Sequence, residues 1–193
     1  MIYKQLFGLL FLFANSSMVL AEPAPARLTP EQIAPLQRLY ELNKALDVKG
    51  IPPIRLVSFA ASGKDVAITK IEGKTARENS IYMMGVGEGR PGEAFISIRL
   101  FQDCVITGDD VPMLQQTIQV DGQAVEVFVV CTITGTDGAK QLAFVPHSAP
   151  GKQVIYEAFM ARPFVFMTLQ GVEVPFKAEG FEHVWKKAKV SAR

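Results

Sequence analysis

Two similar heptapeptides carry the side chains of this sequence that are best suited to chemistry. "CVITGDD" runs from Cys104 to Asp110, and "CTITGTD" runs from Cys131 to Asp137. The carboxylates of Asp109, Asp110 and Asp137 could form a catalytic or metal-binding set. The shared pattern Cys-x-Ile-Thr-Gly-x-Asp is also typical of a strand end, a glycine turn and an aspartate that caps the turn. We favour this turn interpretation.

Cys104 and Cys131 are the only cysteines in the chain, and in an exported protein such a pair favours a disulfide. Two buried free thiols or an intermolecular bridge are the alternatives. In a flat meander, the strand at 114–120 would separate the two cysteine-bearing strands by about 9.6 Å, beyond the roughly 7 Å limit for bridged Cα atoms. A bridge therefore requires that residues 105–112 leave the sheet or that the two strands lie in facing sheets.

Other candidate motifs are weaker. His147 and His183 lack the spacing of a metal-binding pair such as H-E-x-x-H. His147 with Ser148 could be half of a nucleophile pair, whereas His183 is expected on the surface. The glycine-rich "GVGEGRPG" at 85–92 has no helix after it to receive a pyrophosphate. We expect a mobile loop there, in which Arg90 can meet an acidic group of a partner.

The first 21 residues are expected to be a secretory signal peptide. Lys4 precedes an apolar run over residues 6–13, and "VLA" gives a cleavage site after Ala21. Polar residues 15–17 interrupt the run, which argues against a membrane anchor. Removing 21 of 193 residues leaves 172, with 19 basic and 19 acidic side chains. This balance favours neither nucleic acid nor an anionic membrane as a partner.

Residues 22–28 are predicted to be a flexible, proline-rich leader, and residues 29–193 a single domain. Thr29 and Pro30 have the residue types of a helix start. A helical stripe follows and ends near Gly50, and Pro35 could kink this helix or set its true start. The stripe consists of Leu36, Leu39, Tyr40, Leu42 and Leu46. The chain closes with a second helix, marked by Phe181, Val184, Trp185 and Ala188 and ending in a basic, solvated turn.

Between these helices the hydrophobic period is two, which predicts strands. Hairpins are expected for 54–60 with 66–71 and for 164–170 with 172–178. The clearest hairpin turns at Asp121-Gly122 and pairs Ile118 with Val125 and Leu114 with Val129. The alternation points both cysteines inward, while segment 151–162 could be a helix or a strand. The predicted fold class is mainly β, antiparallel and β-sandwich-like, with an N-terminal and a C-terminal α-helix.

From about Ile96 onward the order of features resembles the invasion-associated locus B (IalB) family of secreted bacterial proteins. The matching segments are "ISIRL", "VITGDDVPML", "QTIQVDGQ", "VEVFVVC" with Gly135 after it, "GVEVPFKAEGF" and a final helix. Members of that family carry a second cysteine close after the one that matches Cys131, whereas Thr136 follows Gly135 here, so Cys104 would have to supply the partner. The resemblance implies an extracytoplasmic, β-rich, non-enzymatic protein of the envelope or of host contact.

The favoured function is a non-enzymatic interaction protein, periplasmic or secreted, without a cofactor or metal. Its partner would be a protein of the envelope, of a host or of a competitor, with a role in host contact or envelope assembly. The predicted contact loops contain Arg90, Asp109 and Asp110. The alternatives are a periplasmic inhibitor or immunity protein against a cell-wall hydrolase or toxin, and a small periplasmic hydrolase that uses His147 or the aspartates.

Overall fold

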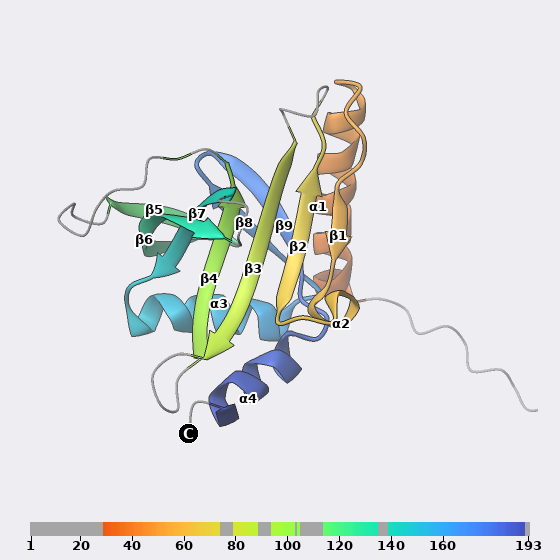
Figure 1. Ribbon diagram of the computed structural model, residues 1–193. Helices are drawn as coiled ribbons and strands as arrows, with labels where there is room; N and C mark the ends of the chain where they lie inside the picture. Colours follow the sequence, from red (N-terminus) through yellow and green to blue (C-terminus); the bar gives the residue numbers. More distant parts are fainter. Residues whose placement is uncertain are drawn as a thin grey trace, which may run out of the picture.

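The computed structural model describes residues 29–73, 79–88, 94–102, 104, 114–134 and 139–191. The predicted signal peptide (1–21) and leader (22–28) lie outside these ranges, so both stay predictions. The described residues form one antiparallel sheet flanked by helices (Figure 1). The strands are β1 (Arg55–Val57), β2 (Val66–Ile71), β3 (Ser80–Glu88), β4 (Ala94–Phe101), β5 (Leu114–Val120), β6 (Gln123–Thr134), β7 (Ala139–Pro146), β8 (Phe164–Leu169) and β9 (Val172–Lys177). The helices are α1 (Pro30–Asp47), α2 (Phe59–Ser62), α3 (Ala149–Ala161) and α4 (Phe181–Ser191).

The strand order in the sheet is β1-β2-β3-β4-β7-β6-β5-β8-β9. The sheet curls until it is nearly a barrel, and the Thr69 hydroxyl of β2 donates a hydrogen bond to the Pro175 carbonyl of β9 across the seam. Proline has no N–H to offer a neighbouring strand, which suits Pro175 to a position facing this seam. The mainly β class with an N-terminal and a C-terminal helix is confirmed, and the β component is one curled sheet.

The two tight hairpins have the local chemistry that their sequences predict. Asp121 and Gly122 have φ values of 48° and 87°, and a two-residue turn with positive φ at both positions matches the twist of the strands it joins. The predicted pairs Ile118–Val125 and Leu114–Val129 are confirmed. Gln170 and Gly171 repeat this conformation between β8 and β9, with φ values of 50° and 80°.

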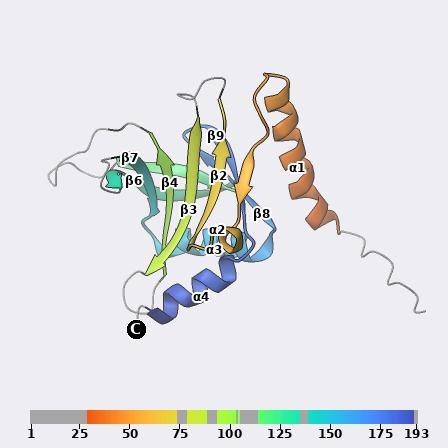
Figure 2. The same ribbon diagram turned by 45° about the vertical axis from the view of Figure 1, so that its right-hand side comes forward.

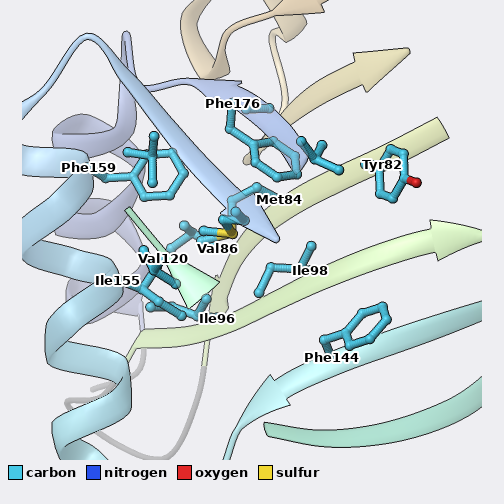
Figure 3. Packing of buried hydrophobic residues seen from close by; sticks show 14 of the residues in the cluster. Tyr82, Met84, Val86, Ile96, Ile98, Val120, Phe144, Ile155, Phe159 and Phe176 are labelled. Carbon is cyan, nitrogen blue, oxygen red and sulfur yellow. The ribbon is translucent and has the colours of Figure 1, made fainter. Parts of the chain in front are cut away.

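The core fills the inside of the curled sheet, and α3 closes one end of it. Figure 3 shows Ile155 and Phe159 of α3 pointing toward side chains of β3, β4 and β5. Fully or almost fully buried members of this core include Met84, Val86, Ile96, Ile98, Val120, Phe144, Val174 and Phe176. Helix α4 adds Phe181, Val184 and Ala188. Burial of this apolar surface is the main force that holds the sheet in its curled form.

Two segments differ from the strand pattern expected for them. The predicted strand 54–60 ends at Val57, and α2 follows, with the Ser58 hydroxyl accepting a hydrogen bond from the Ala61 N–H. This helical turn places Phe59 in the core, 2% exposed. Segment 151–162, which the sequence left open, is mostly α3, and the Ser148 hydroxyl caps its first turn.

Helix α1 has the predicted start and ends close to the predicted position. It lies outside the sheet (Figure 2), and its Arg38 contacts Phe166 of β8 and Glu173 of β9. Pro35 lies inside the helix rather than at its start and is buried. The predicted stripe is divided, because Leu39, Leu42 and Leu46 are half-buried whereas Leu36 and Tyr40 are exposed. One apolar face of α1 is therefore left without a partner among the described residues.

Candidate functional site

The predicted contact residues Arg90, Asp109 and Asp110, and the further candidate Asp137, lie outside the described ranges. The loops that contain them stay predictions. Among the described residues, no group of three or more His, Cys, Asp or Glu side chains is placed to hold a metal ion. Within the same ranges, no helix has both the length and the apolar character that crossing a membrane demands.

Cys104 and Cys131 form a disulfide, with their Cα atoms 5.9 Å apart. The strand between β4 and β6 is β7, not the strand at 114–120 as a meander would require. Cys104 lies beyond the end of β4 at Phe101, so the chain has left the sheet before the bridge is made. Both cysteines are half-buried, which corrects the expectation that they lie inside the core.

The polar groups of His147 and Ser148 make contacts with other residues. The Ser148 hydroxyl accepts a hydrogen bond from the Gly151 N–H at 3.2 Å. His147 Nε2 lies 2.8 Å from Glu126 Oε2, and its ring packs on Phe128 with centroids 5.1 Å apart. The two side chains therefore cap α3 and join it to β6. His183 is exposed on α4, as predicted.

A cleft of about 490 Å³ lies between α1 and the body of the protein. Its walls come from α1, the β5–β6 turn, the end of α3 and β8, which are far apart in the sequence. The lining residues are Ala34, Pro35, Arg38, Asp121, Ala161, Arg162, Phe164 and Phe166. This volume falls within the range of about 300–1,000 Å³ that is usual for ligand sites, so we take the α1 cleft as the candidate site.

Arg38 joins α1 to the sheet. Its Nε donates a hydrogen bond to Glu173 Oε1 on β9 at 2.6 Å. Its guanidinium carbon lies 4.4 Å from the centroid of the Phe166 ring, which is a cation–π arrangement. The side chain remains 45% exposed, so Arg38 both covers Phe166 and presents charge to the cleft.

Asp121 and Arg162 also line the α1 cleft. Asp121 Oδ1 accepts a hydrogen bond from the Phe166 N–H at 3.0 Å, and the Asp121 N–H donates to the Phe166 carbonyl at 2.8 Å. Oδ2 lies 3.0 Å from Arg162 Nη1, an ion pair that lacks the alignment of a hydrogen bond. The Asp121 side chain is 6% exposed and that of Arg162 is 50% exposed. The arginine therefore neutralises a buried carboxylate and still faces solvent.

The lining of the cleft combines two positive charges, one negative charge and an aromatic floor. Asp121 is buried and Glu173, which pairs with Arg38, is less exposed than the two guanidinium groups, so the arginines present the more accessible charge to a ligand. This arrangement can bind an anionic group that is attached to an apolar one. It supplies no nucleophile beside a base.

Ionisable groups with shifted pKa values also occur outside the α1 cleft. Burial raises the pKa of the Tyr82 hydroxyl inside the sheet, although its hydrogen bond with Ser80 opposes this. Lys177 lowers the pKa of Glu179, and Lys186 lowers that of Glu182. These carboxylates are solvated ion-pair partners, so their pKa values describe the surface around α4.

Comparisons of the chain with known protein families, with curated proteins and with solved structures find no match.

Sequence reasoning did not find the α1 cleft, because its charged residues come from three elements and form no motif. Arg38 is an ordinary helix residue, Asp121 was identified only as a turn residue, and Arg162 is the last residue of a segment that could have been a helix or a strand. Only the tertiary fold brings them together. The apolar stripe predicted for 29–50 gave no signal for the cleft, because none of its residues lines it.

Proposed function

We propose that this chain is a non-enzymatic interaction protein that works outside the cytoplasm and binds a protein partner through the α1 side of the molecule. The observation that carries the proposal is the outer face of α1. Ile33, Leu36 and Tyr40 are 45%, 42% and 66% exposed. Their spacing of three and four residues places them on one stripe, and grouped exposed apolar side chains commonly mark an interaction site.

The exposed stripe and the α1 cleft lie on opposite faces of the same helix, because Ile33, Leu36 and Tyr40 are offset by roughly half a turn from Ala34 and Arg38. A partner that covers the stripe contacts the cleft as well only where it reaches past the edge of α1. Tyrosine and arginine are enriched among the residues that dominate protein–protein binding energy. Tyr40 lies on the stripe and Arg38 lines the cleft. This combination of an apolar stripe and a charged recess supports binding to a protein surface.

Two features support a location outside the cytoplasm. The Cys104–Cys131 disulfide is compatible with an oxidising compartment, and the sequence predicts a signal peptide cleaved after Ala21. The resemblance to the invasion-associated locus B family favours the same location. We accordingly place the protein in the periplasm or outside the cell, in envelope assembly or host contact.

The use of the polar side chains supports binding rather than catalysis. Ser148 caps α3, and His147 contacts Glu126 instead of the serine. Asp121 is held by the Phe166 N–H and by Arg162. In these three cases the groups that could have served as nucleophile, base or acid have structural partners.

The test is crosslinking in cells that export the full chain through its own N-terminus. A photoreactive amino acid replaces Tyr40 on the α1 stripe or, as a matched control, the exposed Gln153 on α3. We expect one dominant protein partner from position 40, none from position 153, and loss of the crosslink after Leu36→Glu. The same partner from both positions, together with an unaffected Leu36→Glu variant, would refute the proposal. The partner's identity separates an envelope or host role from inhibition of a hydrolase.

A further inference from the structure

We propose that the α1 cleft binds a carboxylate together with the apolar group that carries it, as found at the C-terminal residue of a protein chain. This inference rests on the proposed function, because it names the part of the partner that enters the cleft.

The first argument is the number of hydrogen-bond donors that face the cleft. A guanidinium has five N–H donors and no acceptor. The contact with Glu173 uses Nε of Arg38, and the contact with Asp121 uses Nη1 of Arg162. Each of these contacts engages one nitrogen of its guanidinium, and both side chains are about half-exposed. Donors on both arginines can therefore reach an anionic ligand.

The second argument is the orientation of Arg38. Its guanidinium carbon lies over the Phe166 ring, 4.4 Å from the centroid, and the N–H groups of a guanidinium point outward from the edge of its plane. That edge matches a planar carboxylate, which it can bind through two parallel hydrogen bonds. Glu173 holds Nε, which fixes the side chain in this position before a ligand arrives. The cost of ordering Arg38 on binding is thereby reduced.

The third argument is the closeness of the charged and apolar parts of the α1 cleft. Phe164 and Pro35 line the same recess as Arg38, and the guanidinium itself rests on the aromatic floor. A ligand must therefore carry its negative charge within a few bonds of its apolar group. A C-terminal residue has this property, because its carboxylate and its side chain share one Cα atom.

The fourth argument is electrostatic. Asp121 is the one acidic residue among the lining residues, and it is buried behind Arg162. Glu173 is 30% exposed and engages Nε of Arg38, so an entering carboxylate has to bind the Nη nitrogens of Arg38 together with Arg162. Opposite charges in such a partly desolvated recess attract more strongly than they would in bulk water.

The experiment titrates the isotopically labelled full chain with N-acetyl-phenylalanine and, separately, with its C-terminal amide, and follows backbone NMR signals. We expect saturable shifts at Ala34, Asp121 and Phe166 with the acid, and binding at least tenfold weaker with the amide. Inorganic phosphate, which lacks an apolar group, serves as a third probe and should also bind at least tenfold more weakly. Equal binding of acid and amide, equal binding of phosphate, or acid-induced shifts elsewhere would each overturn the inference.

Variants sharpen the assignment. Arg38→Gln and Arg162→Gln should each weaken binding of the acid about tenfold or more. Arg38→Lys should lower the affinity for the acid by less, because the ammonium keeps the charge without the planar edge. The matched control is Arg55→Gln, since Arg55 is an exposed arginine on β1 that pairs with Glu72 at 3.5 Å, outside the cleft lining. It should bind like the parent. Should Arg38→Gln fail to fold, Arg162→Gln and Arg38→Lys give the same decision.

The outcome can be separated from that of the proposed function. If position 40 still crosslinks one partner while acid and amide bind equally, the α1 side is an interaction surface but the carboxylate inference is wrong. If acid binding is confirmed and no partner is crosslinked, the α1 cleft takes a small carboxylic acid and the protein-binding proposal is wrong.

Discussion

The two terminal helices of this protein have similar apolar patterns and different environments. Helix α4 buries Phe181 against Phe159 and Phe59, with ring centroids 4.8 and 5.6 Å away. Helix α1 leaves Leu36 and Tyr40 exposed. Both carry apolar side chains at helical spacing, yet one completes the core and the other stands outside the sheet (Figures 1 and 2).

The difference shows that an apolar stripe predicts a helix without telling which partner covers it. Helix α4 is held by aromatic packing, where each side chain contributes a few kcal/mol. Polar contacts help to hold α1, such as the Arg38–Glu173 pair and the hydrogen bond from the Ile54 N–H to the Asn43 side chain. Contacts of this kind contribute about 1 kcal/mol each. We infer that α1 is the element adapted for a partner and α4 the element adapted for stability.

The largest loss of stability is expected from a substitution that breaks the aromatic packing of α4. Phe181→Ala should lower the free energy of unfolding by about 3–5 kcal/mol, because it removes a ring that is 1% exposed and contacts two other phenylalanines. Leu36→Ala on α1 is the control and should change it by less than about 0.5 kcal/mol. Urea denaturation measures both. Similar losses for the two variants would contradict the contrast between the helices.

The next largest loss of stability is expected when the disulfide is removed and both helices are left intact. The double variant Cys104→Ala/Cys131→Ala should lose about 2–4 kcal/mol, since the bridge closes a sequence separation of 27 residues in the unfolded chain. The same denaturation measurement applies, with the reduced parent protein as a second comparison. A loss below about 1 kcal/mol would show that the bridge hardly restrains the unfolded state.

A smaller loss of stability is expected from a substitution that weakens only the contacts of α1. Arg38→Ala removes the cation–π contact with Phe166 and the ion pair with Glu173, and we expect a loss of about 1 kcal/mol. Limited proteolysis should then cut within α1 faster than in the parent, while the rest of the chain keeps its resistance. Faster cutting across the sheet as well would mean that α1 is part of the cooperative core.

The smallest effect concerns acid stability at α4. Lys186 lowers the pKa of Glu182 in the folded protein, so the stabilising pair is complete above the ordinary carboxyl pKa of about 4.3. The contribution is lost as the pH falls through the lowered folded value. The free energy of unfolding, measured from pH 7 to pH 3, should be slightly lower for Glu182→Gln than for the parent at pH 7. This difference should disappear at low pH. If the difference grew as the pH fell, the pKa of Glu182 would be raised in the folded protein and not lowered.

Sequence reasoning was most accurate where structure depends on neighbouring residues. The predicted turn at Asp121-Gly122 requires positive φ, and a two-residue turn fixes the register of both its strands. The hairpin at Gly171 was also predicted, although Gln170 belongs to its turn and not to the strand. The two terminal helices were predicted from their apolar spacing, and α1 ends at Asp47, close to the predicted end near Gly50. Sequence reasoning did not predict the strand order, because this order depends on pairing between strands that are far apart in the sequence. No local sequence pattern places β7 between β4 and β6.

The site was predicted less well than the fold for the same physical reason. The glycine-rich and aspartate-rich loops attracted attention because their composition is unusual, and they lie outside the described residues. The α1 cleft needs Arg38, Asp121 and Arg162, whose positions in the chain are unrelated until β8 pairs with β5 and α1 covers Phe166. Charge recognition of this kind is a property of the folded surface.

Hydrogen exchange of the full chain, alone and with the crosslinked partner, tests the central claim most directly. In the free protein we predict that α1 amides exchange through a local opening well below the free energy of global unfolding, while α3 and α4 exchange near the global value. In the complex, α1 and the Asp121 turn should gain protection and α4 should not change. If α1 is as protected as the sheet in the free protein, and the partner instead protects residues 85–92 or 105–113, then α1 is not the binding element and the account is wrong.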